Sequence, residues 1–344
     1  MKSSRAVLVH VLALASVLTL PTLSRAQQQK AQPIVISGSS TVYPFSQAAI
    51  KLFTPKTPKG VSFQANAQGT SAGFRSFCAR NIPIAAASRP INASELKACK
   101  SNGVDFLELP IAFDAITIVV HPSNTFVKEI SLAQLKTLWE KKAQAKILRW
   151  NQLNPNWPAS TIKLCGPGAD SGTYDVFNKA VNGSETNSRQ DYTASEDDNV
   201  LVKCVANTPG ALGYFGYDYY QGNQTILRAL PVKGLRGTVM PSAASVQDSR
   251  YLPLSRPLFL YVNAASLRST PAIRLFIVQT LERGIQVADK AKLIPLKDST
   301  YRLVLNKLYR NILGSAFAGR LPIGLSVGQI LERSFDQHKQ PQFR

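Results

Sequence analysis

One stretch near the amino end decides the fold: Ile34-Val-Ile-Ser-Gly-Ser-Ser-Thr-Val-Tyr-Pro-Phe45. Its β-branched start indicates a buried strand that runs into a helix. Between them Gly38 permits a tight turn, and Ser39, Ser40 and Thr41 stand at the start of the helix. Such a turn offers free backbone N–H groups, the positive end of a helix dipole and hydroxyl donors. This is the chemistry of an anion site.

Two further turns have the same design. Gln68-Gly-Thr-Ser-Ala-Gly-Phe74 follows a predicted strand at 61–65, and Cys165-Gly-Pro-Gly-Ala-Asp-Ser-Gly-Thr-Tyr174 follows one at 161–165. A single turn of this kind is weak evidence, because Ser and Thr are ordinary helix caps. Three of them, each with glycine for close backbone approach, favour a bound anion.

The pattern between these turns predicts an α/β fold with buried strands. A helix capped by Ser131 is expected, as is one opened by Pro271 and stopped by Gly284. The polar stretches 181–199 and 218–225 are predicted to be surface loops. The expected strands are 34–36, 61–65, 82–87, 104–109, 115–120, 161–165, 211–215 and 257–262.

The composition fits one large or two medium domains: 344 residues, 44% of them hydrophobic. Forty Lys+Arg against 20 Asp+Glu give a net charge of +20, yet only 17% of the chain is charged. The excess therefore reflects scarce acids, and no nucleic-acid partner is expected. We interpret it as a solvated basic surface, with steering of anions as the alternative.

The first 26 residues read as a signal peptide. Lys2 and Arg5 precede an apolar run at 6–20, and Ser24-Arg25-Ala26 offers a cleavage site. No later stretch is apolar enough to span a membrane. We expect an exported, soluble, periplasmic protein with a formal charge of +17.

Four cysteines agree with export, and they allow three pairings. We favour Cys78 with Cys99 and Cys165 with Cys204, since each pair closes a moderate loop; free buried thiols are the alternative. A metal site is not expected, because no CxxC occurs and the mature chain has only His121 and His338.

Nucleotide and hydrolase motifs are missing from the glycine-rich turns. No GxxxxGK[ST] occurs, and Asp170 occupies the wrong slot for GxSxG. We therefore predict neither catalysis nor a cofactor. Arg89, held by Pro90 at the end of a predicted strand, is instead placed to grip an oxyanion with its planar fork; a surface salt bridge is the alternative.

At these turns the chain resembles the periplasmic phosphate-binding proteins that feed ABC-type phosphate importers, especially their cyanobacterial-type subgroup. The resemblance implies a two-lobed periplasmic-binding-protein clamshell with a discontinuous first lobe, 30–112 plus 255–344, and a second lobe at 113–254. It implies ligand contacts from Ser40, Thr41, Val42, Thr70, Ser71, Ser171, Gly172 and Thr173, with Val42 acting through its N–H. The matching stretches are 38–44 (GSSTVYP), 69–77, 87–91, 150–155, 166–177 and 209–214.

Two positions depart from the family pattern. Pro167 stands where many relatives have an arginine, so Arg89 is the expected substitute. Ala86 stands where relatives with this arginine have an Asp. A carboxylate there would accept a hydrogen bond from protonated phosphate and repel sulfate. Asp170 and Asp114 are the candidate replacements, with a helix N-cap and an interlobe salt bridge as their respective alternatives.

The function implied is capture of inorganic phosphate and its delivery to the membrane permease of an ABC importer. Binding of another tetrahedral oxyanion (sulfate, molybdate or arsenate) is the main alternative. An exported phosphatase is a further one, although no nucleophile with a partner base is visible in the sequence.

Overall fold

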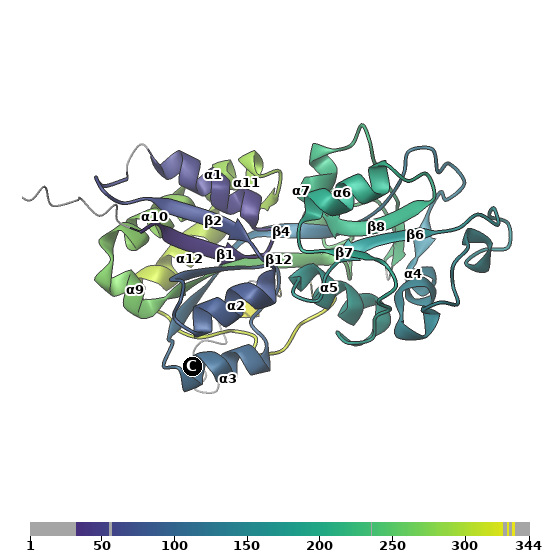
Figure 1. The fold of residues 1–344 in the computed structure, drawn as a ribbon. Helices are drawn as coiled ribbons and strands as arrows, with labels where there is room; N and C mark the ends of the chain where they lie inside the picture. Colours follow the sequence, from purple (N-terminus) through teal and green to yellow (C-terminus); the bar gives the residue numbers. More distant parts are fainter. Residues whose placement is uncertain (1–31, 55–56, 235, 326–328, 330–331, 334–344) are drawn as a thin grey trace, which may run out of the picture. The chain divides into compact units, whose positions relative to one another are not determined.

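A single path of hydrogen-bonded strands runs through the chain in the order β2-β1-β3-β12-β4-β8-β6-β7 (Figure 1). The computed structural model describes residues 32–344 except 55–56, 235, 326–328, 330–331 and 334–344, so the predicted signal peptide and His338 lie outside the described residues. The strands are β1 (Ile34–Gly38), β2 (Phe63–Ala67), β3 (Ile84–Ala87), β4 (Phe106–Val120), β6 (Lys163–Pro167), β7 (Thr193–Ser195), β8 (Ala211–Gly216) and β12 (Ser255–Asn263).

Short strands complete the architecture. β9 (Arg228–Ala229) and β13 (Ile294–Pro295) each pair with β4, and a separate small sheet has the order β11-β10-β5. Its members are β5 (Ile130–Ser131), β10 (Val232–Gly234) and β11 (Gly237–Val239).

Strand β4 joins the two halves of the sheet. Residues 106–115 pair with β12, whereas residues 116–120 pair with β8. The sequence predicted two strands here, 104–109 and 115–120; instead one fully buried strand of 15 residues continues through Pro110. The missing N–H of Pro110 is tolerated because the register shifts beside it, between Leu258 and Phe259 of β12.

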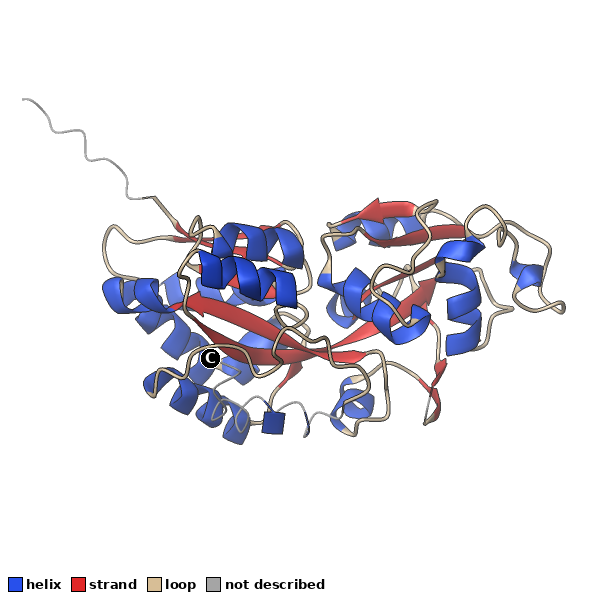
Figure 2. Cartoon of the chain, turned by 90° about the horizontal axis from the view of Figure 1, so that it is seen from below, coloured by secondary structure: helices blue, strands red, loops and turns tan. Residues whose placement is uncertain are grey.

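Helices cover both faces of the sheet (Figure 2). They are α1 (Tyr43–Phe53), α2 (Thr70–Cys78), α3 (Ala93–Ser101), α4 (Leu132–Trp139), α5 (Gly172–Phe177), α6 (Asp198–Ala206), α7 (Tyr217–Gly222), α8 (Ala243–Gln247), α9 (Ala264–Ser269), α10 (Pro271–Glu282), α11 (Gly284–Lys290) and α12 (Asp298–Tyr309). Short helical turns lie at Lys141–Ala143, Trp150–Gln152 and Asn178–Asn182. No helix of the described residues is long and apolar enough to cross a membrane.

Helix starts were predicted better than loops. Ser131 caps α4, and Pro271 opens α10. The prediction of surface loops at 181–199 and 218–225 was wrong in part: these stretches contain β7, the start of α6 and most of α7. Polarity there does not mean exposure, because the side chains of Arg189 and Asp218 are buried.

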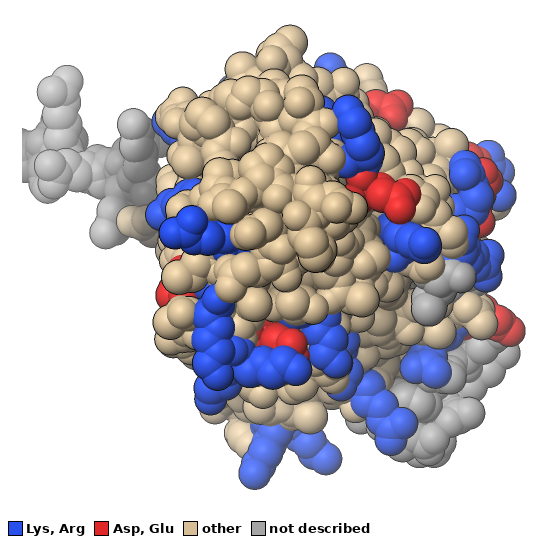
Figure 3. Space-filling view, turned by 90° about the vertical axis from the view of Figure 1, so that its right-hand side faces the viewer, with Lys and Arg blue, Asp and Glu red and all other residues tan. Residues whose placement is uncertain are grey.

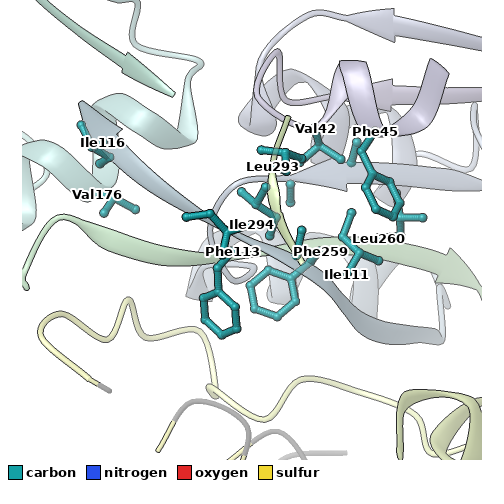
Figure 4. Close-up of a cluster of buried hydrophobic side chains, with 14 of the residues drawn as sticks. Val42, Phe45, Ile111, Phe113, Ile116, Val176, Phe259, Leu260, Leu293 and Ile294 are labelled. Carbon is teal, nitrogen blue, oxygen red and sulfur yellow. The ribbon is translucent and has the colours of Figure 1, made fainter. Parts of the chain in front are cut away.

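One large hydrophobic core runs along the sheet. Figure 4 shows part of it, where Val42 and Phe45 come from the first turn and helix, and Phe113 and Phe259 come from β4 and β12. All four side chains are buried. The first Ser-rich turn is therefore fixed to the core by its apolar neighbours, which holds its hydroxyl groups in place.

Both favoured disulfides are present. Cys78–Cys99 joins the end of α2 to α3, and Cys165–Cys204 joins β6 to α6. The second bridge links the strand that leads into the Asp-Ser-Gly-Thr turn with the helix that carries Asp198.

Replacing Cys165 and Cys204 together by alanine is expected to lower the free energy of unfolding by about 3–4 kcal/mol, because the bridge closes a loop of 39 residues. Urea unfolding followed by circular dichroism measures this change. Wild-type protein unfolded with a reductant serves as the comparison. A midpoint unchanged by the double substitution would contradict the stabilising role.

Candidate anion-binding site

The three predicted turns meet where β1, β2 and β6 end. Each strand leads directly into a turn and then a helix: β1 into α1, β2 into α2 and β6 into α5. Ligands of α/β proteins bind at such carboxyl ends of strands. The hydroxyl side chains of the three turns are buried, with almost no access to water. They are Ser39, Ser40, Thr41, Thr70, Ser171 and Thr173.

Arg256 lies at the centre of this cluster. Its Nη2 donates to Thr41 Oγ1 at 3.2 Å and to Thr173 Oγ1 at 2.7 Å. These two hydroxyl oxygens are themselves 3.4 Å apart. Nη1 donates to the carbonyl of Ser88 at 3.2 Å. One buried guanidinium therefore joins hydroxyl groups from the first and third turns.

Asp114 neutralises Arg256. Its Oδ2 accepts from Nε at 3.0 Å and from Nη2 at 2.8 Å, and its Oδ1 accepts from the N–H of Tyr217 at 2.9 Å. Both side chains of the ion pair are buried. The sequence offered Asp114 as a phosphate contact or as a salt bridge, and here it forms the salt bridge.

The second turn approaches the third without intervening side chains. A Cβ placed on Gly172 would lie 2.6 Å from Ser88 Oγ and 2.8 Å from Thr70 Oγ1, so only glycine fits there. Ser88 N–H donates to Thr70 Oγ1, and the two hydroxyl oxygens are 3.2 Å apart. Thr70 and Gly172, both predicted ligands, are thus brought together.

Arg89 is buried but fully engaged by the protein. Its five N–H groups donate to Asp175 Oδ2, to the Pro90 carbonyl, to both Glu95 oxygens and to Ser71 Oγ. Burial opposes its charge, yet Glu95 and Asp175 outweigh burial and raise the pKa of Arg89. Burial also raises the pKa of Asp175 to about 6, although Arg89 opposes this. In this structure Arg89 therefore holds Ser71 and has no guanidinium N–H group left free for a ligand.

Asp170 lies at the edge of the cluster. Its carboxylate accepts two hydrogen bonds from Arg75, at 2.7 and 2.8 Å, which hold the pKa of Asp170 below its usual range. Its carbonyl accepts from Ser71 N–H at 2.9 Å. Asp170 does not cap α5, because that role belongs to Ser171. These bonds join the second turn to the third.

The remaining predicted ligands have local partners. Val42 N–H donates to Ser39, and Thr173 N–H donates to Ser171 Oγ at 3.1 Å. The carbonyl of Ser40 accepts from Tyr219 Oη at 3.2 Å.

Carboxyl groups line the side of the cluster formed by α6 and α7. Burial raises the pKa of Asp198 to about 7, opposed by a hydrogen bond from the Ser40 side chain. Burial, followed by the charges of Asp114 and Asp198, raises the pKa of Asp218 well above its ordinary value. Near the third turn, burial raises the pKa of Glu196 to about 7.

The sequence analysis missed Arg256, Ser88, Asp198 and Asp218. A signal for Arg256 was present, because Ser255-Arg256-Pro257 repeats the Ser-Arg-Pro of residues 88–90. Residues 255–257 open β12, and residues 88–90 directly follow β3, its antiparallel neighbour. No comparable signal marked Asp198 or Asp218, which stand in stretches that read as polar loops.

These groups together are suited to one small oxyanion. Hydroxyl and guanidinium donors converge from separate turns, and burial strengthens each hydrogen bond by excluding water. No group of three or more His, Cys, Asp or Glu side chains in the described part of the chain is arranged to hold a metal ion.

Comparison with known proteins supports this assignment. Residues 23–277 match the model of a PBP superfamily domain. The chain is 43% identical to the protein SphX of Synechocystis over 89% of this chain and 90% of that protein. It is 34% identical to the phosphate-binding protein PstS of Staphylococcus haemolyticus over 79% and 83% of the two chains.

Solved structures agree in fold. A possible phosphate binding protein from Planctomyces limnophilus superposes with a TM-score of 0.60 at 37% identity, covering 81% of this chain and 98% of that one. A proposed phosphate ABC transporter substrate-binding protein from Clostridium perfringens, solved with bound phosphate, gives a TM-score of 0.65 at 27% identity over 77% and 100%. The α/β, two-lobed binding-protein fold is thereby confirmed, and the chain belongs to the PBP superfamily, in the family that includes SphX and PstS.

Proposed function

We propose that this protein binds inorganic phosphate in the cell envelope and delivers it to the membrane permease of an ABC importer. The observation that carries the proposal is the buried convergence on Arg256 of hydroxyl groups from the first and third turns, with Thr70 of the second turn packed against Gly172 of the third. The relatives named for phosphate binding support it. The role is binding and release, with no chemical step.

The proposed ligand contacts come from both lobes, taken as 30–112 plus 255–344 and 113–254. Arg89 acts through Ser71, and Asp170 acts through Arg75. Micromolar affinity requires roughly 8 kcal/mol, which several water-shielded donors supply. The contacts proposed are Ser40, Thr41, Val42, Thr70, Ser71, Ser171, Gly172, Thr173 and Arg256.

The basic surface is proposed to assist capture. Figure 3 shows that Lys and Arg outnumber Asp and Glu on the face formed by the β6 end of the molecule. Positive potential over such a face raises the local concentration of anions, and salt screens it beyond roughly 8 Å. This surface does not select among anions.

Replacing Arg256 by glutamine together with Asp114 by asparagine is expected to raise the phosphate dissociation constant about ten- to a hundredfold, because a charged hydrogen-bond donor is lost. The double change removes both members of the ion pair, so no lone buried charge remains. Isothermal titration calorimetry with phosphate measures the effect.

Circular dichroism of the same sample controls for folding. A folded double variant with wild-type phosphate affinity would contradict a ligand role for Arg256. If sulfate displaced phosphate from the wild type at equal concentration, the assignment to phosphate would be replaced by another tetrahedral oxyanion.

Replacing Asp170 by asparagine is expected to speed phosphate dissociation about two- to fivefold, because the ion pair with Arg75 holds the second and third turns together. The effect is small since the two side chains are 62% and 39% exposed, where ion pairs contribute at most about 1 kcal/mol. Stopped-flow measurement of phosphate release provides the rate.

Arg302→Gln is the matched control, since it breaks an exposed ion pair within α12. If Asp170→Asn released phosphate at the wild-type rate, the proposal that the Asp170–Arg75 ion pair holds the second and third turns together would be refuted. A changed preference between phosphate and sulfate in that variant would instead restore Asp170 as the acceptor of the phosphate proton.

A further inference from the structure

The segment between α4 and β6 carries positive charge without matching acids. Residues 141–163 include five Lys or Arg residues and no Asp or Glu. Figure 3 shows this end of the molecule, where blue side chains outnumber red ones. The five residues are all exposed, and together they are called the basic face: Lys141, Lys142, Lys146, Arg149 and Lys163.

Backbone contacts keep the basic face compact. The short helical turn at 141–143 accepts the N–H of Lys146 at 3.0 Å, through the carbonyl of its last residue. Arg149 forms an antiparallel bridge with Thr161, and Lys163 follows two residues later. The bases therefore lie close together although the segment contains little regular structure.

An apolar side chain stands within the basic face. Leu148 is 45% exposed and lies between Lys146 and Arg149 in the sequence. Gln152 Oε1 accepts from the N–H groups of Leu148 at 2.8 Å and Arg149 at 2.9 Å. Its Nε2 donates to the Lys146 carbonyl at 2.9 Å. One glutamine side chain thus fixes the loop that presents Leu148 to solvent.

The acids that flank this segment are already paired. Glu140 is 7% exposed and forms an ion pair with Lys142 at 3.1 Å. Asp191 pairs with the buried Arg189 at 2.6 Å and also accepts the N–H of Ala145 at 2.9 Å. Both acids are occupied, so the remaining positive charge of the basic face is left unbalanced.

The basic face is separate from the anion site. Lys163 begins β6, whereas the third turn follows Pro167 at the other end of the same strand. Four steps along a strand span roughly 13 Å, which exceeds the screening length of about 8 Å at physiological salt. The basic face is therefore free to contact a second partner while the site holds its anion.

We propose that the basic face docks the protein on an anionic lipid membrane, with Leu148 inserted among the headgroups. Fluid lipids adapt to any spacing of charges, and each basic residue near an anionic membrane strengthens binding about fivefold. An exposed apolar side chain gains from entering the boundary between headgroups and acyl chains, which a soluble polyanion does not offer. Leu148 among the bases thus favours a lipid surface over an acidic polymer.

The test is sedimentation of residues 27–344 with vesicles made of equal parts phosphatidylcholine and phosphatidylglycerol. The predicted signal peptide is left out, because its apolar run would bind lipid by itself. The wild type is expected to bind these vesicles, to bind less at high salt, and not to bind vesicles of phosphatidylcholine alone. Changing Lys141, Lys146 and Lys163 together to glutamine is expected to raise the lipid concentration for half binding about a hundredfold.

A second triple variant controls for total charge. Lys51, Lys97 and Lys290 are exposed on α1, α3 and α11, on the half of the molecule away from α4 (Figure 1). Changing these three lysines to glutamine removes the same charge and is expected to shift half binding less than twofold. Circular dichroism checks that both triple variants are folded.

A serine substitution tests the apolar contact. Leu148→Ser is expected to raise the lipid concentration for half binding about three- to tenfold, because less apolar surface leaves water. Leu303→Ser on α12 is the matched control, since Leu303 is 49% exposed, and it is expected to have no effect.

Three results would each overturn the inference. Equal weakening by the two triple variants would mean that only total charge matters. Wild-type vesicle binding by Leu148→Ser would remove the apolar contact. Binding to the soluble polyanion heparin, with none to the anionic vesicles, would assign the basic face to an acidic polymer. Phosphate titration of the wild type tests the proposed function separately, because membrane docking does not require a bound anion.

Discussion

The ion pair between Arg256 and Asp114 is the interaction on which the rest of the site depends. The two residues face each other across β12 and β4, at the place where the halves of the sheet meet. A lone charge could not be buried there, because desolvation would outweigh any local gain. With Asp114 beside it, the buried Arg256 side chain reaches Thr41 and Thr173 from one position.

The second constraint is that the turns must approach each other closely, which requires glycine at the points of contact. Gly172 packs against Thr70 and Ser88, and Gly69, with φ of 89°, lies against the backbone of Asp170. Any side chain at either position would force the turns apart. The same contacts exclude water from the hydroxyl groups, so each donor acts in a medium of low dielectric.

The local patterns of the sequence predicted much of this fold and less of the site. Strand-turn-helix units depend on neighbouring residues, and they were recognised from Gly, Ser and Thr at fixed offsets. The roles of the two Ser-Arg-Pro arginines depend on distant partners: Arg89 is held by Asp175, and Arg256 by Asp114. Polarity around Asp218 indicated a loop, because pattern analysis equates polar with exposed.

The protein as a whole is strongly basic, whereas its candidate site contains several acidic side chains. The chain carries +20 overall, yet Arg256 lies near two buried acids, Asp114 and Asp198, and a third, Asp218, lies near both of these. Attraction at the site therefore comes from oriented N–H and O–H dipoles and not from excess cations. Surface charge raises the rate at which any anion arrives, but it does not distinguish one tetrahedral anion from another, so selectivity requires the geometry of the buried groups.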